Sequence, residues 1–128
     1  MNLSDIRDWL RDKVDCPQWF LNSMTVKTDQ CIAIYNSTGQ APRLALGGLE
    51  NTSYTNKPIS ILVHWGTSPS QAEAKAQEVY DLLFGQSAVI GGKRVIMFDT
   101  RHTEPLSLGT DSEGIFEFLI EVNIIHER

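Results

Sequence analysis

The first residues of the chain follow a helical pattern of apolar and polar positions. The apolar residues recur every three or four positions, which places them on one face of an α-helix: Ile6, Trp9, Leu10 and Val14. Ser4 is expected to cap this helix, because a serine hydroxyl accepts a hydrogen bond from a free N–H of the first turn. Pro17 disfavours helical geometry at Cys16, so the helix is expected to end near Asp15.

Alternation of apolar and polar residues predicts β-strands along much of the remaining chain. Trp19 to Val26 is an extended segment of mixed character. The predicted strands are Cys31 to Tyr35, Arg43 to Leu46, Ile59 to Trp65, Ala88 to Ile90, Arg94 to Phe98, and Ile115 to about Ile125. The Ile59–Trp65 segment has apolar residues on both faces, which indicates a central strand, and Pro58 is expected to stand just before it. Gly91-Gly92 suits the two-residue turn of a hairpin.

A second helix has the clearest start in the chain. Ser68 and Gln71 have the spacing of a capping box, and Pro69 falls at the first helical position, where its missing N–H is tolerated. The residues that follow at helical spacing are Ala72, Ala76, Val79 and Leu83. Gly85 is expected to end the helix, since glycine readily adopts the left-handed conformation of a C-terminal cap.

Two long stretches lack any periodicity and are expected to be loops. They are Gly47 to Lys57, which is expected to be a mobile loop or a long hairpin tip, and His102 to Gly114. The first contains two isolated apolar residues, Leu49 and Tyr54. Such residues either have no role or anchor a partner that orders the loop.

The order of elements is helix, strands, helix, hairpin and strand. This order predicts an α/β (α+β) fold: a two-layer sandwich with a mixed, mostly antiparallel sheet and two helices on one face. The length of 128 residues predicts a single domain over residues 1–128.

The charge pattern argues against tight binding of nucleic acid. The net charge is −5, and the 11 basic residues are scattered among acidic ones. A protein that grips phosphates needs clustered lysine and arginine. The first ten residues have no apolar run, and no stretch approaches the roughly 18 apolar residues of a membrane span. We therefore expect a soluble, intracellular product with reduced cysteines and no membrane association.

Three polar constellations are candidates for chemistry. His64, His102 and His126 are isolated from one another and from both cysteines, whereas a zinc site needs converging ligands. His64 is therefore expected to be a hydrogen-bonded sheet residue. Ser68 lacks the glycine spacing of a nucleophile elbow and is explained as a helix cap.

The third constellation is the carboxylates Asp99, Asp111 and Glu113. They would suit a divalent ion in a small hydrolase or nuclease. The alternative interpretation is turn chemistry, because Asp111 lies in a Gly-Thr-Asp-Ser segment before a strand. We expect no cofactor and no metal.

Four segments carry a family resemblance that spans nearly the whole chain. They are Lys57 to Gly66, the helix Glu73 to Leu83, the hairpin Ile90 to Val95, and Pro105 to Asp111 before the long last strand. Their order and lengths resemble the small minor capsid, or tail terminator, proteins of long-tailed phages. No single motif among them is diagnostic.

The resemblance implies a structural virion protein without catalytic residues. Proteins of this family sit at the head-proximal end of the tail tube, usually as a hexameric ring. The ring stops tube polymerisation and presents a surface to the head–tail connector. The implied partners are further copies of the chain, the tail tube protein and the connector protein, with DNA passing through the lumen without specific binding. Assembly would take place in the host cytoplasm.

A closed ring of identical subunits needs two different surfaces on each subunit. We expect the first long loop to supply part of one and to become ordered on assembly. The candidate assembly interface is Leu46, Gly47, Gly48, Leu49 and Tyr54. Three alternatives stay open: a head–tail adaptor or tail completion protein, the metal-dependent hydrolase or nuclease, and a monomeric ligand-binding module.

Overall fold

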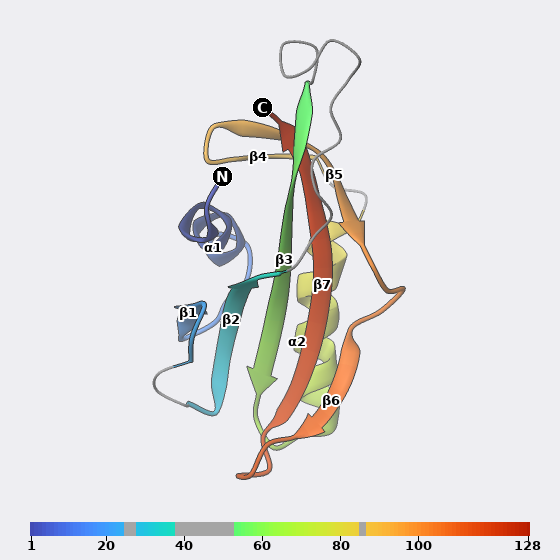
Figure 1. Ribbon diagram of the computed structural model, residues 1–128. Coiled ribbons are helices and arrows are strands. Elements are labelled where there is room, and N and C mark those ends of the chain that lie inside the picture. Colours follow the sequence, from blue (N-terminus) through green and yellow to red (C-terminus); the bar gives the residue numbers. More distant parts are fainter. Residues whose placement is uncertain (25–27, 38–52, 85–86) are drawn as a thin grey trace.

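The computed structural model describes residues 1–24, 28–37, 53–84 and 87–128 (Figure 1). Two helices and seven strands lie within these residues. In chain order they are α1 (Leu3–Arg11), β1 (Trp19–Leu21), β2 (Gln30–Asn36), β3 (Tyr54–Trp65), α2 (Pro69–Leu83), β4 (Ala88–Ile90), β5 (Lys93–Thr100), β6 (Leu106–Thr110) and β7 (Phe116–Glu127).

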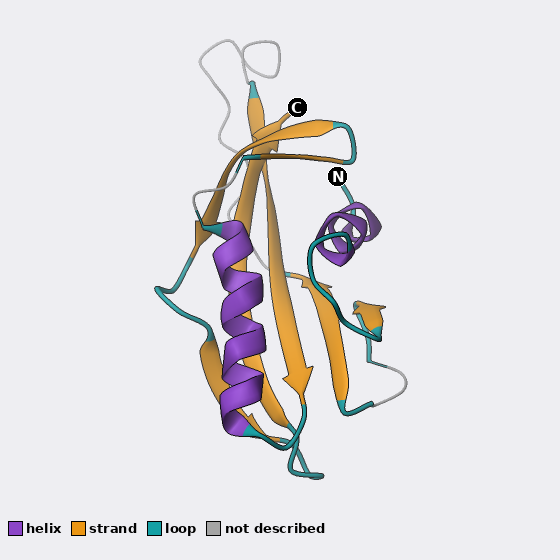
Figure 2. Cartoon of the chain, turned by 180° about the vertical axis from the view of Figure 1, so that it is seen from behind, coloured by secondary structure: helices purple, strands orange, loops and turns teal. Residues whose placement is uncertain are grey.

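The strands form one sheet in the order β1-β2-β3-β7-β5-β4, and β6 pairs with β7 off this path. Only β1 and β2 are parallel, and every other pair in the described residues is antiparallel. Figure 2 shows both helices on the same side of the sheet. The predicted two-layer α+β sandwich with a mixed, mostly antiparallel sheet is therefore confirmed.

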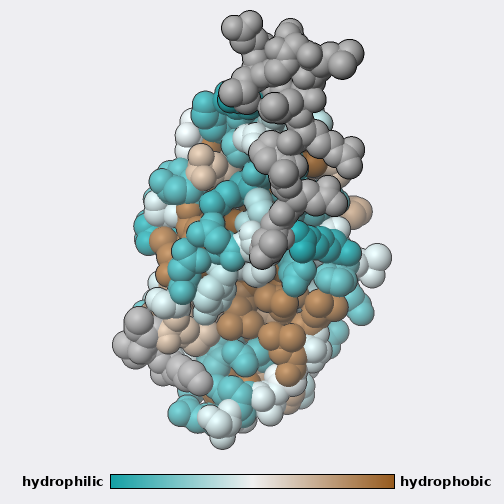
Figure 3. Space-filling view, viewed as in Figure 1, coloured by the Kyte–Doolittle hydropathy of each residue, from teal (hydrophilic) through white to brown (hydrophobic). Residues whose placement is uncertain are grey.

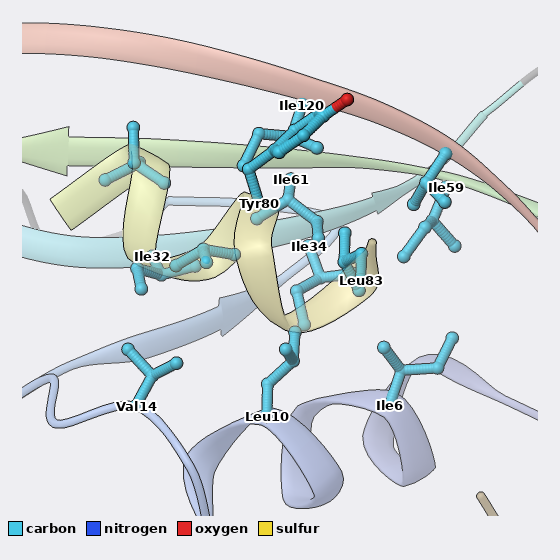
Figure 4. Packing of buried hydrophobic residues seen from close by; sticks show 14 of the residues in the cluster. Ile6, Leu10, Val14, Ile32, Ile34, Ile59, Ile61, Tyr80, Leu83 and Ile120 are labelled. Atoms are coloured by element: carbon cyan, nitrogen blue, oxygen red, sulfur yellow. The ribbon is translucent and has the colours of Figure 1, made fainter. Parts of the chain in front are cut away.

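The core lies between the helices and the sheet, and the strand alternation predicts it correctly. Along β7 every second residue from Phe118 to Ile124 is buried, and these residues face α2. The side chains of Ile61 on β3 and Leu10 on α1 are fully buried in the same cluster (Figure 4). Burying an aliphatic side chain of this size contributes roughly 1.5–3 kcal/mol, so this layer dominates the stability of the fold.

Helix α1 begins earlier than expected, and the prediction of Ser4 as its cap is wrong. Asn2 is the N-cap: its Oδ1 atom accepts from the Asp5 backbone N–H at 3.0 Å, and the Asp5 carboxylate accepts from the Asn2 N–H at 3.0 Å. Ser4 lies inside the first turn and donates to Asn2 Oδ1 at 2.6 Å. The helix ends at Arg11 rather than near Asp15, and the following turn still buries Val14.

The predicted Ser68 cap of helix α2 and its start at Pro69 are confirmed. The Ser68 hydroxyl accepts from the Gln71 N–H at 3.4 Å, and Pro69 is the first helical residue. The residue that caps its C-terminus is Phe84, with an extended backbone. Gly85, the predicted stop, lies outside the described residues.

Strand β3 is longer than predicted, because residues 54–57 belong to it and not to a loop. Pro58 therefore stands inside a strand. The Pro58 carbonyl accepts from the Ser37 N–H at 3.1 Å, on the β2 side. In an antiparallel strand the nitrogen of a residue points to the same side as its carbonyl, so the ladder with β7 loses no donor at Pro58.

The hairpin β4–β5 around Gly91-Gly92 and the long last strand β7 are confirmed. The predicted loop from His102 to Gly114 is wrong in part, because it contains strand β6. Of the extended segment Trp19 to Val26, only Trp19–Leu21 is a strand, and residues 25–27 lie outside the described residues. The predicted strand Arg43 to Leu46 also lies outside them.

Candidate assembly interface

Most of the predicted interface cannot be placed. Leu46, Gly47, Gly48 and Leu49 lie outside the described residues. Tyr54 is the first residue of β3, where it pairs with Glu127 of β7 and is 41% exposed. Tyr54 therefore lies on a regular strand end at the tip of the sheet.

The β4–β5 hairpin carries a group of exposed apolar side chains. Val89 on β4 is 64% exposed and lies directly opposite Arg94 on β5. Ile96 and Met97, at the bulge of β5, are 45% and 48% exposed. Large apolar side chains gathered on one edge of a small protein are typical of a protein contact.

A groove runs between α2 and β6. Its volume is about 340 Å³. Its lining residues are Pro69, Glu73, Gln77, Glu104, Pro105, Leu106, Ser107, Phe116 and Phe118. The apolar lining residues and the carboxylates of Glu73 and Glu104 share this surface, and none of the lining residues is basic.

The face of the sheet away from the helices also bears apolar residues. Leu62, Leu119 and Leu106 are aligned across β3, β7 and β6, and all three are half-buried. Figure 3 views this face and shows a hydrophobic area in its lower half, where β6 and β7 lie in Figure 1. Leu108, at the bulge of β6, is 51% exposed.

His64 is buried on the same face of the sheet, between two carboxylates. Its Nδ1 atom lies 3.2 Å from Glu117 Oε2, and its Nε2 atom lies 3.7 Å from Asp111 Oδ2. Glu117 is the cross-strand partner of His64, whereas Asp111 arrives from the turn after β6. The imidazole thus joins β3, β7 and the β6–β7 turn, in keeping with the predicted structural role of His64.

The three carboxylates of the nuclease alternative do not form one site. Asp111 Oδ1 accepts from the backbone N–H groups of Glu113 and Ile115, at 2.9 and 3.0 Å, which is the predicted turn chemistry. Asp99 lies opposite Asn123, near the other end of β7, roughly 23 Å along the strand from Phe116 at 3.3 Å per residue. No group of three His, Cys, Asp or Glu side chains in the described ranges is arranged to hold a metal ion.

Both cysteines are free thiols. Burial raises the pKa of the Cys16 thiol to about 11 and also raises the pKa of Cys31, because a thiolate is disfavoured away from water. Neither thiol is therefore an activated nucleophile.

Sequence reasoning missed the hairpin surface, the groove and the histidine cluster. All three depend on which strands are neighbours and on the register in which they pair. Periodicity alone predicts neither the neighbours nor the register. Because apolar and polar residues alternate along β3 and β7, the pattern places His64 and Glu117 on the face opposite the apolar core, which is the one signal that indicates their contact.

Fold and surface together define a small α+β protein with exposed apolar side chains and a groove on its surface. The chain matches the model of a family described as "Bacteriophage tail terminator protein" over residues 3–128. The protein belongs to this family of phage tail terminators, so it is a structural component of phage tails that interacts with other tail proteins. The search of curated proteins finds no match. Neither helix in the described residues is long and apolar enough to cross a membrane.

Proposed function

We propose that this protein caps the head-proximal end of the tail tube, ends its polymerisation and joins it to the head–tail connector. The observation that carries the proposal is the family match, which extends over residues 3–128 and thus includes every element described above. Residues 1–128 act as one domain in this role. The working form is a ring of identical subunits, with six as the expected number, placed in the virion after assembly in the host cytoplasm.

The surface features support this role. A cap must contact a neighbouring copy on each side, the tube below and the connector above, so it needs several protein-binding surfaces. The exposed hairpin side chains form one such area, and the α2–β6 groove and the leucine row, which share Leu106, form a second. Leu46, Gly47, Gly48, Leu49 and Tyr54 contribute to the same assembly contacts. The net charge of −5 suits a lumen through which DNA slides without adhering.

The test is a phage with an amber codon in this gene, grown with and without a suppressor. We expect tails longer than normal and not joined to heads when the protein is absent, as seen by electron microscopy. Expression of the wild-type chain in trans restores both length and joining. Purified protein added to growing tubes of the tail tube protein stops elongation and leaves a ring of density at one end.

Each rival function gives a different outcome. Tails of normal length that fail to join heads indicate a head–tail adaptor and contradict a terminator. Normal, joined virions in the absence of the protein contradict every structural role proposed here. A metal-dependent nuclease activity lost on Asp111→Ala contradicts the assignment as a structural protein alone.

A further inference from the structure

The outward side of the β4–β5 hairpin combines apolar residues with a positive charge. Val89 and Arg94 are direct cross-strand partners, and Val89 is 64% exposed. The Arg94 side chain is 66% exposed, and its Nε atom lies 3.8 Å from the Glu127 carboxylate. A guanidinium has five N–H donors, so this contact leaves Arg94 able to reach a second carboxylate.

The α2–β6 groove has the complementary composition. Pro105, Phe116 and Phe118 supply apolar surface in it, while Glu73 of α2 and Glu104 before β6 are both exposed carboxylates. A groove that combines apolar surface with negative charge fits a segment that combines apolar side chains with a positive charge. The hairpin has this chemistry.

The hairpin cannot fill the groove of its own chain. Val95 of the hairpin pairs with His126 of β7, whereas Ser107 of β6, at the groove, pairs with Phe118. These positions on β7 are roughly 26 Å apart at 3.3 Å per residue. Figures 1 and 2 agree that β4 and β6 lie toward opposite ends of the molecule.

We propose that the hairpin of one copy docks in the α2–β6 groove of the next copy. Arg94 of the first copy then faces Glu73 and Glu104 of the second, and Val89 and Ile96 lie against its apolar lining. The contact joins two different surfaces, so each subunit keeps a free hairpin and a free groove until a ring closes. This assignment rests on the proposed function, because it names the surfaces through which the terminator ring forms.

The test is charge reversal on the two surfaces, with native mass spectrometry and electron microscopy of capped tubes. Glu73→Lys and Arg94→Glu each place like charges together, so each is expected to weaken self-association at least about 10-fold. Two exposed residues outside both surfaces give matched controls: Glu113→Lys and Arg11→Glu leave assembly unchanged. Thermal unfolding of each monomer verifies that the variant is folded, which matters for Arg94→Glu because of its contact with Glu127.

Rescue identifies the pairing itself. In an equimolar mixture of the two single variants, alternating subunits bring the groove of each E73K chain to the hairpin of an R94E chain. The other contacts in such a ring join a native groove to a native hairpin. Rings with an even number of subunits are therefore restored in part, because Glu104 still opposes the new carboxylate, and the double variant E73K/R94E assembles alone more strongly than either single variant.

The outcomes separate this inference from the proposed function. If wild-type protein caps tubes and both folded single variants do so equally well, the interface is wrong and the terminator function stands. Loss of assembly in the single variants without rescue by the mixture or the double variant also overturns the pairing. If the wild-type chain neither caps tubes nor forms rings on them, the proposed function falls and the interface falls with it.

Discussion

Gly91, at the tip of the β4–β5 hairpin, lies directly against the side chain of Asp5 in α1. A Cβ atom at position 91 would stand 2.7 Å from Asp5 Oδ2, closer than any ordinary contact. Asp5 is held in place by the capping box, where its carboxylate accepts the Asn2 N–H. The hairpin tip therefore packs against the start of the helix, and a Cβ atom at position 91 requires the Asp5 side chain to move.

The first prediction concerns this contact. Gly91 has φ +58° and Gly92 has φ +77°, so Gly→Ala at either position strains the backbone by about 1 kcal/mol. Gly91→Ala also displaces Asp5 from its capping role, which adds about 1 kcal/mol. Urea unfolding is expected to show Gly91→Ala as the less stable variant by this difference. Gly92→Ala is the matched control, because its Cβ meets nothing within 4 Å. Equal loss in both variants contradicts the role of Asp5.

The second prediction separates the observed helix cap from the expected one. Asn2→Ala removes the acceptor for the Asp5 N–H and is expected to cost about 1 kcal/mol in the free energy of unfolding. Ser4→Ala loses only a hydroxyl that donates to the same Asn2 oxygen, so it is expected to change stability by less than about 0.5 kcal/mol. Chemical denaturation of the two variants measures the difference. A larger loss of stability in Ser4→Ala than in Asn2→Ala would show that Ser4 is the capping residue.

Ser4 and Asn2 illustrate how far the sequence determines the fold. Both residue types are good N-caps, and the apolar stripe from Ile6 onward fixes the face of the helix but not its first turn. The apolar stripe predicts the buried side of α1, and the alternation predicts the buried side of β7. Both patterns extend along the whole element, so they can be recognised in the sequence. Cap identity depends on one or two hydrogen bonds, which periodicity does not record.

Strand β6 shows why other elements were missed. Leu106–Thr110 is short, mostly exposed and contains Gly109, so the brief alternation of Leu106, Ser107 and Leu108 is too weak a signal to predict a strand. It is extended because β7 continues past the end of β5 and offers free backbone groups there. The groove follows from this pairing, and so it could not be predicted before β6 was known.

The third prediction concerns His64. His64→Leu leaves the carboxylates of Glu117 and Asp111 without the imidazole between them, and both are at least partly buried. We expect a loss of about 2 kcal/mol in the free energy of unfolding, since a buried polar group that loses its partner is costly. The exposed His102 gives the control, and His102→Leu is expected to change stability by less than about 0.5 kcal/mol.

A double-mutant cycle of His64→Leu with Glu117→Gln assigns the interaction. The two effects are expected to be non-additive by at least about 0.5 kcal/mol, because the side chains are in contact. Strict additivity would show that the loss in His64→Leu does not come from the pairing with Glu117.

The fourth prediction uses the pKa of Cys16, which burial raises from 9.0 to about 11. At pH 8 only about 0.1% of such a thiol is ionised, so alkylation by iodoacetamide is about 100-fold slower than for a thiol of pKa 9. The rate is expected to rise about tenfold per pH unit and to level off only near pH 11. Cys16→Ser is the control, because the remaining Cys31 is 0% exposed and reacts only after unfolding. The same shift makes stability depend on pH, because the thiol ionises at a lower pH in the unfolded chain than in the folded one. The free energy of unfolding is therefore expected to be highest below about pH 9 and to decline as the pH rises towards about 11. Rapid labelling of native protein at pH 8 that disappears in Cys16→Ser would contradict the raised pKa of Cys16.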